Sequence, residues 1–223
     1  MSTLLRLFAL TITLMFSISA NALNKPVGLI DDRDDPFRLF VLFHDDVPES
    51  KRSTAYVEYI HPFTTEFEKI TGRKIHPVFD RSRPPYTNFH YKAADPNVMF
   101  DRWNELTWNY RKERHDSNEF RFSRNDRVLL ITNDFINGSP LFGGLGGIAT
   151  QPGNSAIASL DFKQIVGHEL GHTFNAVHEE GEVLYNGWWC ETFMFEPLPL
   201  RSNCYVFSEG NGKRIKAYVD SLY

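Results

Sequence analysis

The feature that most constrains this chain is the stretch 168–178, which reads HELGHTFNAVH. Positions four apart on an α-helix lie on one face, so His168 and His172 present both imidazoles to one metal ion. Glu169 then lies beside them, within reach of a water molecule on that metal. Neutral imidazole suits Zn²⁺, and three protein ligands leave the open position that catalysis needs. The spacing therefore predicts one catalytic zinc ion, with His168, His172 and His178 as ligands and Glu169 as the base.

This spacing resembles that of the metzincin zinc peptidases, H-E-x-x-H-x-x-G-x-x-H, in which the glycine ends the helix and the third histidine turns back to the metal. The sequence departs from the pattern at one position, because Asn175 stands where glycine is usual. Asparagine enters the left-handed backbone conformation more readily than most residues, so we expect the same turn here. The resemblance implies a zinc metalloendopeptidase that hydrolyses internal peptide bonds.

The resemblance also implies a tight turn with a methionine beneath the zinc ligands. Met194 is the only methionine after the motif, and we expect it at that place. Astacin-like and serralysin-like members carry a tyrosine two residues after the methionine, and here that position is Glu196. The sequence therefore resembles the adamalysin, or reprolysin-like, side of the family.

A glycine-rich segment precedes the motif. A phosphate-binding loop is excluded, because the terminal Gly-Lys-Ser/Thr of a P-loop is missing. In metzincins the corresponding segment is an antiparallel edge strand along the cleft, where glycines let a peptide backbone approach and pair as an added strand. The substrate-binding candidates on this strand are Gly144, Leu145, Gly146, Gly147, Ile148 and Ala149.

Strand-like and helix-like segments alternate before the motif. Phe37–Phe43 is a nearly continuous apolar run, which is typical of a strand buried on both faces. Further elements are predicted as strands at 75–79, 128–132 and 155–159 and as helices at 53–70 and 95–114. This alternation predicts an α/β (α+β) fold: a mixed, mostly parallel twisted sheet with an antiparallel edge strand and helices packed on it.

The zinc-ligand helix is expected at the floor of the cleft. Asp161 would cap this helix, with Gln164 completing a capping box. Glycines and prolines after the motif indicate irregular structure, and the chain ends in a predicted helix at 213–222. We therefore expect one metzincin-like catalytic domain at 23–223, with an upper subdomain at about 36–178 and a small irregular lower subdomain at about 179–223.

The first 22 residues read as a signal peptide. Arg6 precedes an apolar run at 7–18, and Ala20-Asn21-Ala22 forms a small-x-small cleavage site. The run is short for a membrane span, and an uncleaved anchor is the alternative. The expected product is secreted or periplasmic and free of the membrane after cleavage.

The chain has two cysteines, Cys190 and Cys204, 14 residues apart. In an exported protein we expect them to form one disulfide, and free thiols or metal ligands are the alternative. The net charge of −4 argues against a nucleic-acid surface. We expect a monomer whose partner is a protein or peptide substrate bound in extended form.

Three alternatives stay open at the level of the sequence. A gluzincin-type peptidase would take its third ligand from a later glutamate, with Glu191 or Glu196 as candidates. A zinc amidase or deacetylase would use the same ion on a non-protein substrate in a closed pocket. A non-catalytic, zinc-stabilised binding protein would not need Glu169 beside the metal. The motif carries no prediction for calcium.

Overall fold

The computed structural model describes residues 36–140, 143–195 and 201–223, which belong to one compact unit. The predicted signal peptide at 1–22 lies outside these residues, and so does Glu196. Within the described ranges, no helix combines the length and the apolar character that a membrane crossing requires.

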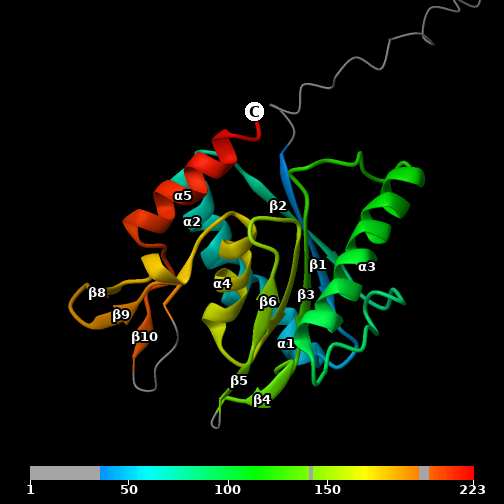
Figure 1. Cartoon of the computed structure of the whole chain (residues 1–223), viewed down its shortest axis with the longest axis horizontal. Coiled ribbons are helices and arrows are strands. Elements are labelled where there is room, and N and C mark those ends of the chain that lie inside the picture. Colours follow the sequence, from blue (N-terminus) through cyan, green and yellow to red (C-terminus); the bar gives the residue numbers. More distant parts are fainter. Residues whose placement is uncertain (1–35, 141–142, 196–200) are drawn as a thin grey trace, which may run out of the picture. The chain divides into compact units, whose positions relative to one another are not determined.

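A five-stranded sheet in the order β2-β1-β3-β7-β6 forms the centre of this unit (Figure 1). Its strands are β1 (Phe37–Phe43), β2 (Ile75–Asp80), β3 (Arg127–Thr132), β6 (Gly147–Ala149) and β7 (Ser155–Ser159). The pairs β1–β2, β1–β3 and β3–β7 are parallel, and β6 pairs antiparallel with β7 at the edge. The predicted mixed, mostly parallel sheet with an antiparallel edge strand is confirmed.

The helices start and stop close to the signals in the sequence. They are α1 (Glu49–Ala55), α2 (His61–Thr71), α3 (Pro96–Asp116), α4 (Lys163–Thr173) and α5 (Glu209–Asp220). A π-helix, η2 (Tyr56–Ile60), joins α1 to α2, so this helical stretch begins before the predicted residue 53. Gly72 ends α2 in the left-handed conformation, with a φ of 69°. Asp95 caps α3 by accepting hydrogen bonds from the N–H groups of Asn97 and Val98.

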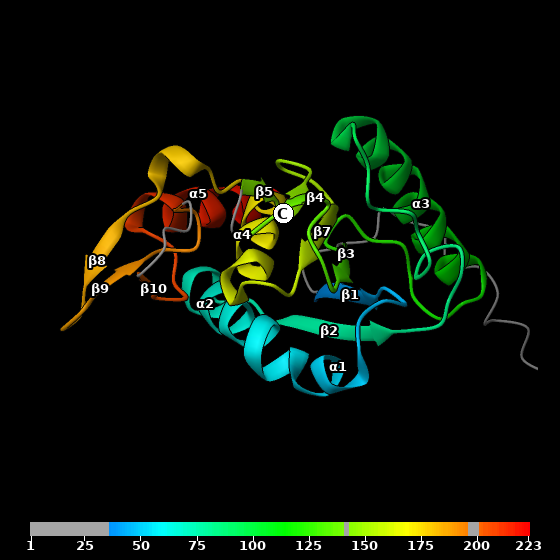
Figure 2. The ribbon, with the colours of Figure 1, turned by 90° about the horizontal axis from the view of Figure 1, so that it is seen from below.

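Both faces of the sheet are buried. Successive side chains of a strand point to opposite faces, so the residues of one strand enter two separate cores. In β1, Phe37, Leu39 and Val41 belong to one apolar core, whereas Phe40 and Leu42 belong to another. The first core is shared with α2, α4 and α5, and the second with α3, so helices cover the sheet on both sides (Figure 2). This three-layer arrangement explains the continuous apolar run of β1.

The predicted edge strand at 144–149 is divided between two strands, β5 and β6. β4 (Asn137–Ser139) and β5 (Gly143–Leu145) pair as an antiparallel hairpin of their own, and only β6 pairs with β7. Gly144 and Leu145 therefore do not belong to the edge strand. The bonding to β7 begins at Gly146, whose carbonyl oxygen accepts a hydrogen bond from Ser159 N–H at 2.8 Å. The residue before it still bonds within the hairpin, because Leu145 N–H donates to Asn137 Oδ1 at 3.2 Å.

The segment after His178 contains more regular structure than expected. A 3₁₀-helix, η3 (His178–Glu180), leads to β8 (Val183–Tyr185), β9 (Trp189–Glu191) and β10 (Ser202–Asn203), which form a small sheet in the order β10-β9-β8. A disulfide joins Cys190 of β9 to Cys204, the residue directly after β10. The β8–β9 turn contains Asn186-Gly187, a strong hairpin signal, with Gly187 at a φ of 104°. Strands of two or three residues are too short to show alternation, which is why periodicity alone does not find them.

Trp103 of α3 is fully buried, and its Nε1–H donates to the carbonyl oxygen of Ala156 on β7 at 3.1 Å. We predict that Trp103→Ala lowers the free energy of unfolding by about 3–5 kcal/mol, because it leaves a cavity and an unpaired buried carbonyl group. Trp108→Ala is the control, because Trp108 lies on the same helix but is 53 % exposed. Urea unfolding measures both variants. A loss for Trp103→Ala no larger than that for Trp108→Ala would contradict this packing.

Candidate metal centre

The helix α4, which carries the first two histidines of the motif, begins later than predicted. Its first residue is Lys163 and its N-cap is Phe162, without a side-chain capping bond. The predicted capping box of Asp161 and Gln164 is therefore wrong. The Asp161 carboxylate instead accepts a hydrogen bond from Ser159 Oγ at 3.1 Å, and the N–H of Asp161 donates to that same Oγ. The Asp161 carboxylate thus stabilises a turn at the end of β7 and does not cap α4.

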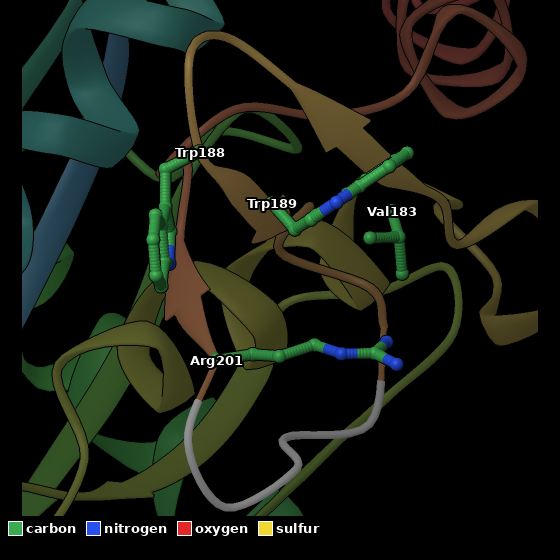
Figure 3. Close-up of a pocket in the computed structure, with 4 residues that line it drawn as sticks. All are labelled: Val183, Trp188, Trp189 and Arg201. Carbon is green, nitrogen blue, oxygen red and sulfur yellow. The ribbon is translucent and has the colours of Figure 1, made fainter.

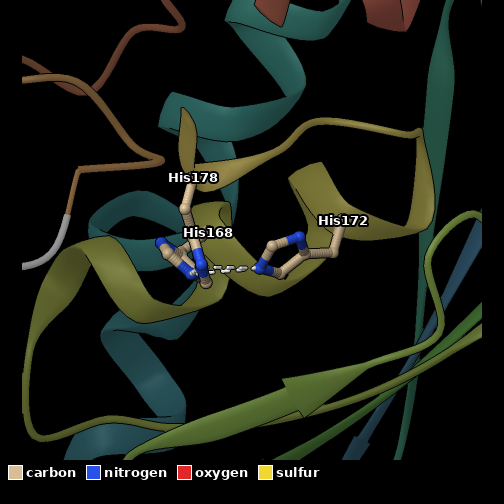
Figure 4. A group of neighbouring side chains, drawn as sticks. All are labelled: His168, His172 and His178. Atoms are coloured by element: carbon tan, nitrogen blue, oxygen red, sulfur yellow. Dashed lines mark hydrogen bonds between the residues drawn. The ribbon is translucent and has the colours of Figure 1, made fainter. Parts of the chain in front are cut away.

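Three imidazoles converge beside α4. The Nε2 atoms of His168 and His178 are 2.8 Å apart, those of His172 and His178 are 3.1 Å apart, and those of His168 and His172 are 3.2 Å apart (Figure 4). In the part of the chain that the structure describes, these side chains form the one group of histidine, cysteine or acidic residues close enough to share a metal ion. The fold thus brings His178 back to the pair on the helix.

Backbone carbonyl groups fix the orientation of two of the rings. His168 Nδ1 lies 2.8 Å from the carbonyl oxygen of Phe193, and His172 Nδ1 lies 3.0 Å from that of Ala176. A carbonyl oxygen only accepts, so each Nδ1 carries the proton in the neutral ring. Both Nε2 atoms are then left with lone pairs that face each other at 3.2 Å without a proton to share.

This donor set fits a zinc ion. Tetrahedral zinc at about 2.0–2.1 Å from each nitrogen separates its ligands by about 3.3–3.4 Å. The observed separations of 2.8, 3.1 and 3.2 Å are somewhat shorter and need only a small expansion. Burial lowers the pKa of His168 to about 3 and that of His172 to about 4, which keeps both rings in the neutral form that binds metal.

Glu169 follows the first histidine and is 6 % exposed. Burial raises the pKa of its carboxyl group to about 8. Neither carboxylate oxygen has a hydrogen-bond partner among the described residues. A carboxyl group whose pKa lies near neutrality is suited to accept and return a proton.

The turn that returns His178 to the helix is built around Asn175. Its φ of 72° is the left-handed conformation that the sequence predicts. The N–H of Asn175 donates to the carbonyl oxygen of His172 at 2.9 Å, and the N–H of Ala176 donates to that of Gly171 at 3.0 Å. This pair of bonds is a Schellman motif, which ends α4 and redirects the chain.

The final helix holds this turn in place. Arg214 of α5 donates from Nε to the carbonyl oxygen of Asn175 at 3.0 Å and from Nη2 to its Oδ1 at 3.3 Å. Asn211, also on α5, exchanges two hydrogen bonds with the backbone of Val177 at 2.8 and 3.0 Å. The asparagine at position 175 therefore has a side-chain partner that glycine would lack. The sequence analysis missed both α5 residues.

The loop after β9 packs on α4 across two glycines. Met194 is fully buried, and a Cβ placed on Gly171 would lie 2.8 Å from its sulfur. A Cβ on Gly167 would lie 2.2 Å from the ring of Phe193. These glycines let the loop come close enough for the Phe193 carbonyl group to reach His168. Gly167 and Gly171 stand four residues apart on one helix face, and this spacing is the signal in the sequence that could have revealed the contact.

The glutamates considered as a third ligand are not part of the cluster. Glu191 is 1 % exposed on β9, and its Oε1 lies 3.9 Å from Arg201 Nη1. It does not belong to the group whose ligand atoms converge. Glu196 lies outside the described residues. Over the ranges that the structure covers, the third donor beside His168 and His172 belongs to His178.

A pocket of about 480 Å³ opens on the small sheet and is lined by Val183, Trp188, Trp189 and Arg201 (Figure 3). Trp188 and Trp189 are 67 % and 59 % exposed. Val183 is the first residue of β8 and Trp189 is the first residue of β9, so both strands of this hairpin contribute to the walls. Aromatic walls of this kind suit an apolar group of a ligand.

Comparisons with known proteins give structural neighbours. No protein-family model matches the sequence, and a search of curated proteins found no match. The chain is similar to archaemetzincin from Methanopyrus kandleri, with 17 % identity, a TM-score of 0.48, and coverage of 84 % of this chain and 98 % of that chain. For a zinc-dependent peptidase from Methanocorpusculum labreanum the values are 16 %, 0.45, 79 % and 99 %. For archaemetzincin from Archaeoglobus fulgidus, complexed with malonate, they are 10 %, 0.39, 79 % and 99 %.

We predict that Asn175→Ala lowers the free energy of unfolding by about 1–2 kcal/mol, because alanine is strained in the left-handed conformation and lacks the amide that bonds Arg214. Asn175→Gly is the matched variant. It loses the same bond without the strain and is expected within about 1 kcal/mol of the parent. Chemical unfolding of the zinc-free proteins gives both values. Equal losses would mean that backbone strain does not control this turn.

Proposed function

We propose that this protein is a zinc-dependent metalloendopeptidase of the metzincin type, on its reprolysin-like side. The observation that carries the proposal is the convergence of three histidine Nε2 atoms, two of which are held as proton-free lone-pair donors by backbone carbonyl groups. Glu169 directly follows the first of these histidines and is buried beside it. A structural zinc site gains nothing from a base at this place, which favours a catalytic site over a zinc-stabilised binding protein.

His168, His172 and His178 would hold a zinc ion, which would supply a Lewis acid for the scissile carbonyl group and would lower the pKa of a bound water molecule to about 7. Glu169 takes a proton from the attacking water molecule and delivers it to the leaving amine. The carbonyl groups of Phe193 and Ala176 hold the first two rings by Nδ1, so neither ring turns away during the reaction.

The proposed substrate is a peptide bound as an extended strand along β6. This strand ends the central sheet, so in that sheet it has a neighbour on one side only. An extended peptide satisfies such an edge by adding a strand. Glu169 lies against Gly147 of β6, so a peptide paired there passes directly by the base. A base beside an open strand edge favours a peptide over the closed pocket expected for a zinc amidase or deacetylase.

We also propose that the protein is exported. The predicted signal peptide at 1–22 supports this proposal. The disulfide between Cys190 and Cys204 supports it as well, because such bonds persist mainly in oxidising compartments. The disulfide encloses the segment with Met194 and so restrains the loop whose carbonyl group bonds His168.

For Glu169→Gln we predict that zinc stays bound while peptide hydrolysis falls by about 10²–10⁴-fold, because glutamine has nearly the same shape but cannot take the proton. Cleavage of casein and of a peptide library, with and without chelator, gives the rate, and elemental analysis gives the zinc content. Full activity in the variant would refute Glu169 as the base. A zinc-loaded parent that cleaves no peptide would refute the peptidase assignment.

His178→Ala is expected to weaken zinc binding by more than about 100-fold. Loss of a mere outer-shell partner costs about 10–100-fold in metal affinity, and a lost ligand costs more. His76→Ala is the control, because His76 is exposed on β2 and lies outside the cluster. Competition against a chromophoric chelator measures both affinities. An unchanged affinity in His178→Ala would favour a glutamate as the third ligand.

A further inference from the structure

We propose that Gly147 is a positioning residue for the base: its missing side chain creates the space in which the Glu169 carboxylate stands against β6. The inference rests on the proposed function of Glu169. A Cβ atom on Gly147 would lie 2.5 Å from both Cγ and Oε1 of Glu169 and 2.7 Å from Cδ. Packed carbon atoms keep about 3.5–4.0 Å between them. Any residue other than glycine therefore overlaps with the base.

The backbone of Gly147 does not itself require glycine. Its φ is not among the positive values, which occur at Gly72, Gly138, Gly143 and Gly187 among the described glycines. Gly147 pairs with Ala158 in regular antiparallel register. Glycine inside a strand is unfavourable relative to alanine and often marks the close approach of another group. The group that approaches here is the carboxylate of Glu169.

If position 147 carried a side chain, Glu169 would move more easily than the strand. β6 is held by its ladder to β7 and by bonds at both ends: Ser159 N–H to the Gly146 oxygen at 2.8 Å, and Thr150 N–H to the Ser155 oxygen at 3.0 Å. Glu169, by contrast, has no hydrogen-bond partner over the residues described. The side chain without a bond gives way, and the base leaves its place beside His168.

The preceding glycine offers a matched variant. A Cβ on Gly146 would meet Cδ1 of Ile165 at 2.7 Å and the ring of Phe135 at 3.1 Å, and Glu169 is not among its nearest neighbours. Ile165 and Glu169 lie four residues apart, on one face of α4. Gly146→Ala therefore disturbs the packing of the same helix on the same segment but leaves the space of the carboxylate intact.

The first test compares steady-state kinetics of the zinc-loaded enzymes on a peptide substrate. Gly147→Ala is expected to lower kcat at least tenfold, with unchanged zinc content and with KM within about twofold, because the base moves while the ligands stay. The acidic limb of its kcat/KM profile shifts with the new surroundings of the carboxylate, which a smaller folded fraction would not cause. Gly212→Ala in α5, where a Cβ meets only Ile70 at 3.8 Å, is the control with the activity of the parent.

The second test needs no activity and uses the melting temperatures of the zinc-free proteins. Gly147→Ala is expected to melt at least about 2 °C below the parent. In a Glu169→Ala background the same change is expected to cost nothing, because the overlapping atoms are gone. Gly146→Ala is expected to cost the same in both backgrounds, because its partner is Ile165.

The two tests separate the inference from the function on which it rests. Equal melting losses for Gly147→Ala in both backgrounds, or a kcat equal to that of the parent, would overturn the inference. Coupling between Gly147 and Glu169 in the melting temperatures upholds the steric role even if the parent cleaves no peptide, an outcome that would refute the proposed function alone.

Discussion

Two backbone carbonyl groups decide what the histidine cluster can do. Because the carbonyl oxygens of Phe193 and Ala176 accept hydrogen bonds from Nδ1, the rings of His168 and His172 point their Nε2 lone pairs at one another, 3.2 Å apart. Such lone pairs repel unless a cation lies between them. These two carbonyl groups therefore orient both Nε2 lone pairs toward one point, which is the arrangement that the ligands of a metal ion need. The Schellman turn and the loop packed on Gly171 serve to bring these carbonyl groups and the third ring into place.

The first two ligands could be read from the sequence because their spacing obeys helix geometry, and the third because Asn175 has a known preference for the left-handed conformation. The structure has Asn175 at a φ of 72° and brings His178 within 2.8 Å of His168. The inner strands were equally accessible, since a strand buried on both faces needs an apolar run. β7 occupies the predicted residues 155–159. These features follow from contacts within one helix, one turn or one strand.

What the sequence could not show depends on long-range contacts or on the backbone. Arg214 bonds Asn175 from 39 positions away in the sequence. Phe193 bonds His168 from 25 positions away through its backbone carbonyl oxygen, a group that every residue has and that no residue type therefore predicts. Asp161 shows a different difficulty: the same carboxylate satisfies either a helix cap or a turn at a strand end, and local preference does not choose between them. The edge strand was predicted to begin at Gly144 but begins at Gly147. The glycines at 143–147 suit a hairpin as well as a strand that another group approaches closely, so their presence does not locate the start of the strand.

Burial changes the pKa of Glu169 and the pKa values of two of the histidines in opposite directions. Burial lowers the pKa values of His168 and His172 to about 3 and about 4 and raises the pKa of the Glu169 carboxyl group to about 8. Desolvation is the largest cause of all three shifts, since a low-dielectric site disfavours every isolated charge. His168, His172 and His178 would hold a divalent cation through their Nε2 lone pairs, and Glu169 would lie beside it as the group that takes the proton. Positions at which a fold departs from the ordinary rules of burial are where function is expected. Here a shared cation accounts for the convergence of three imidazoles beside a buried carboxyl group, and a packing role for the same residues does not account for that convergence.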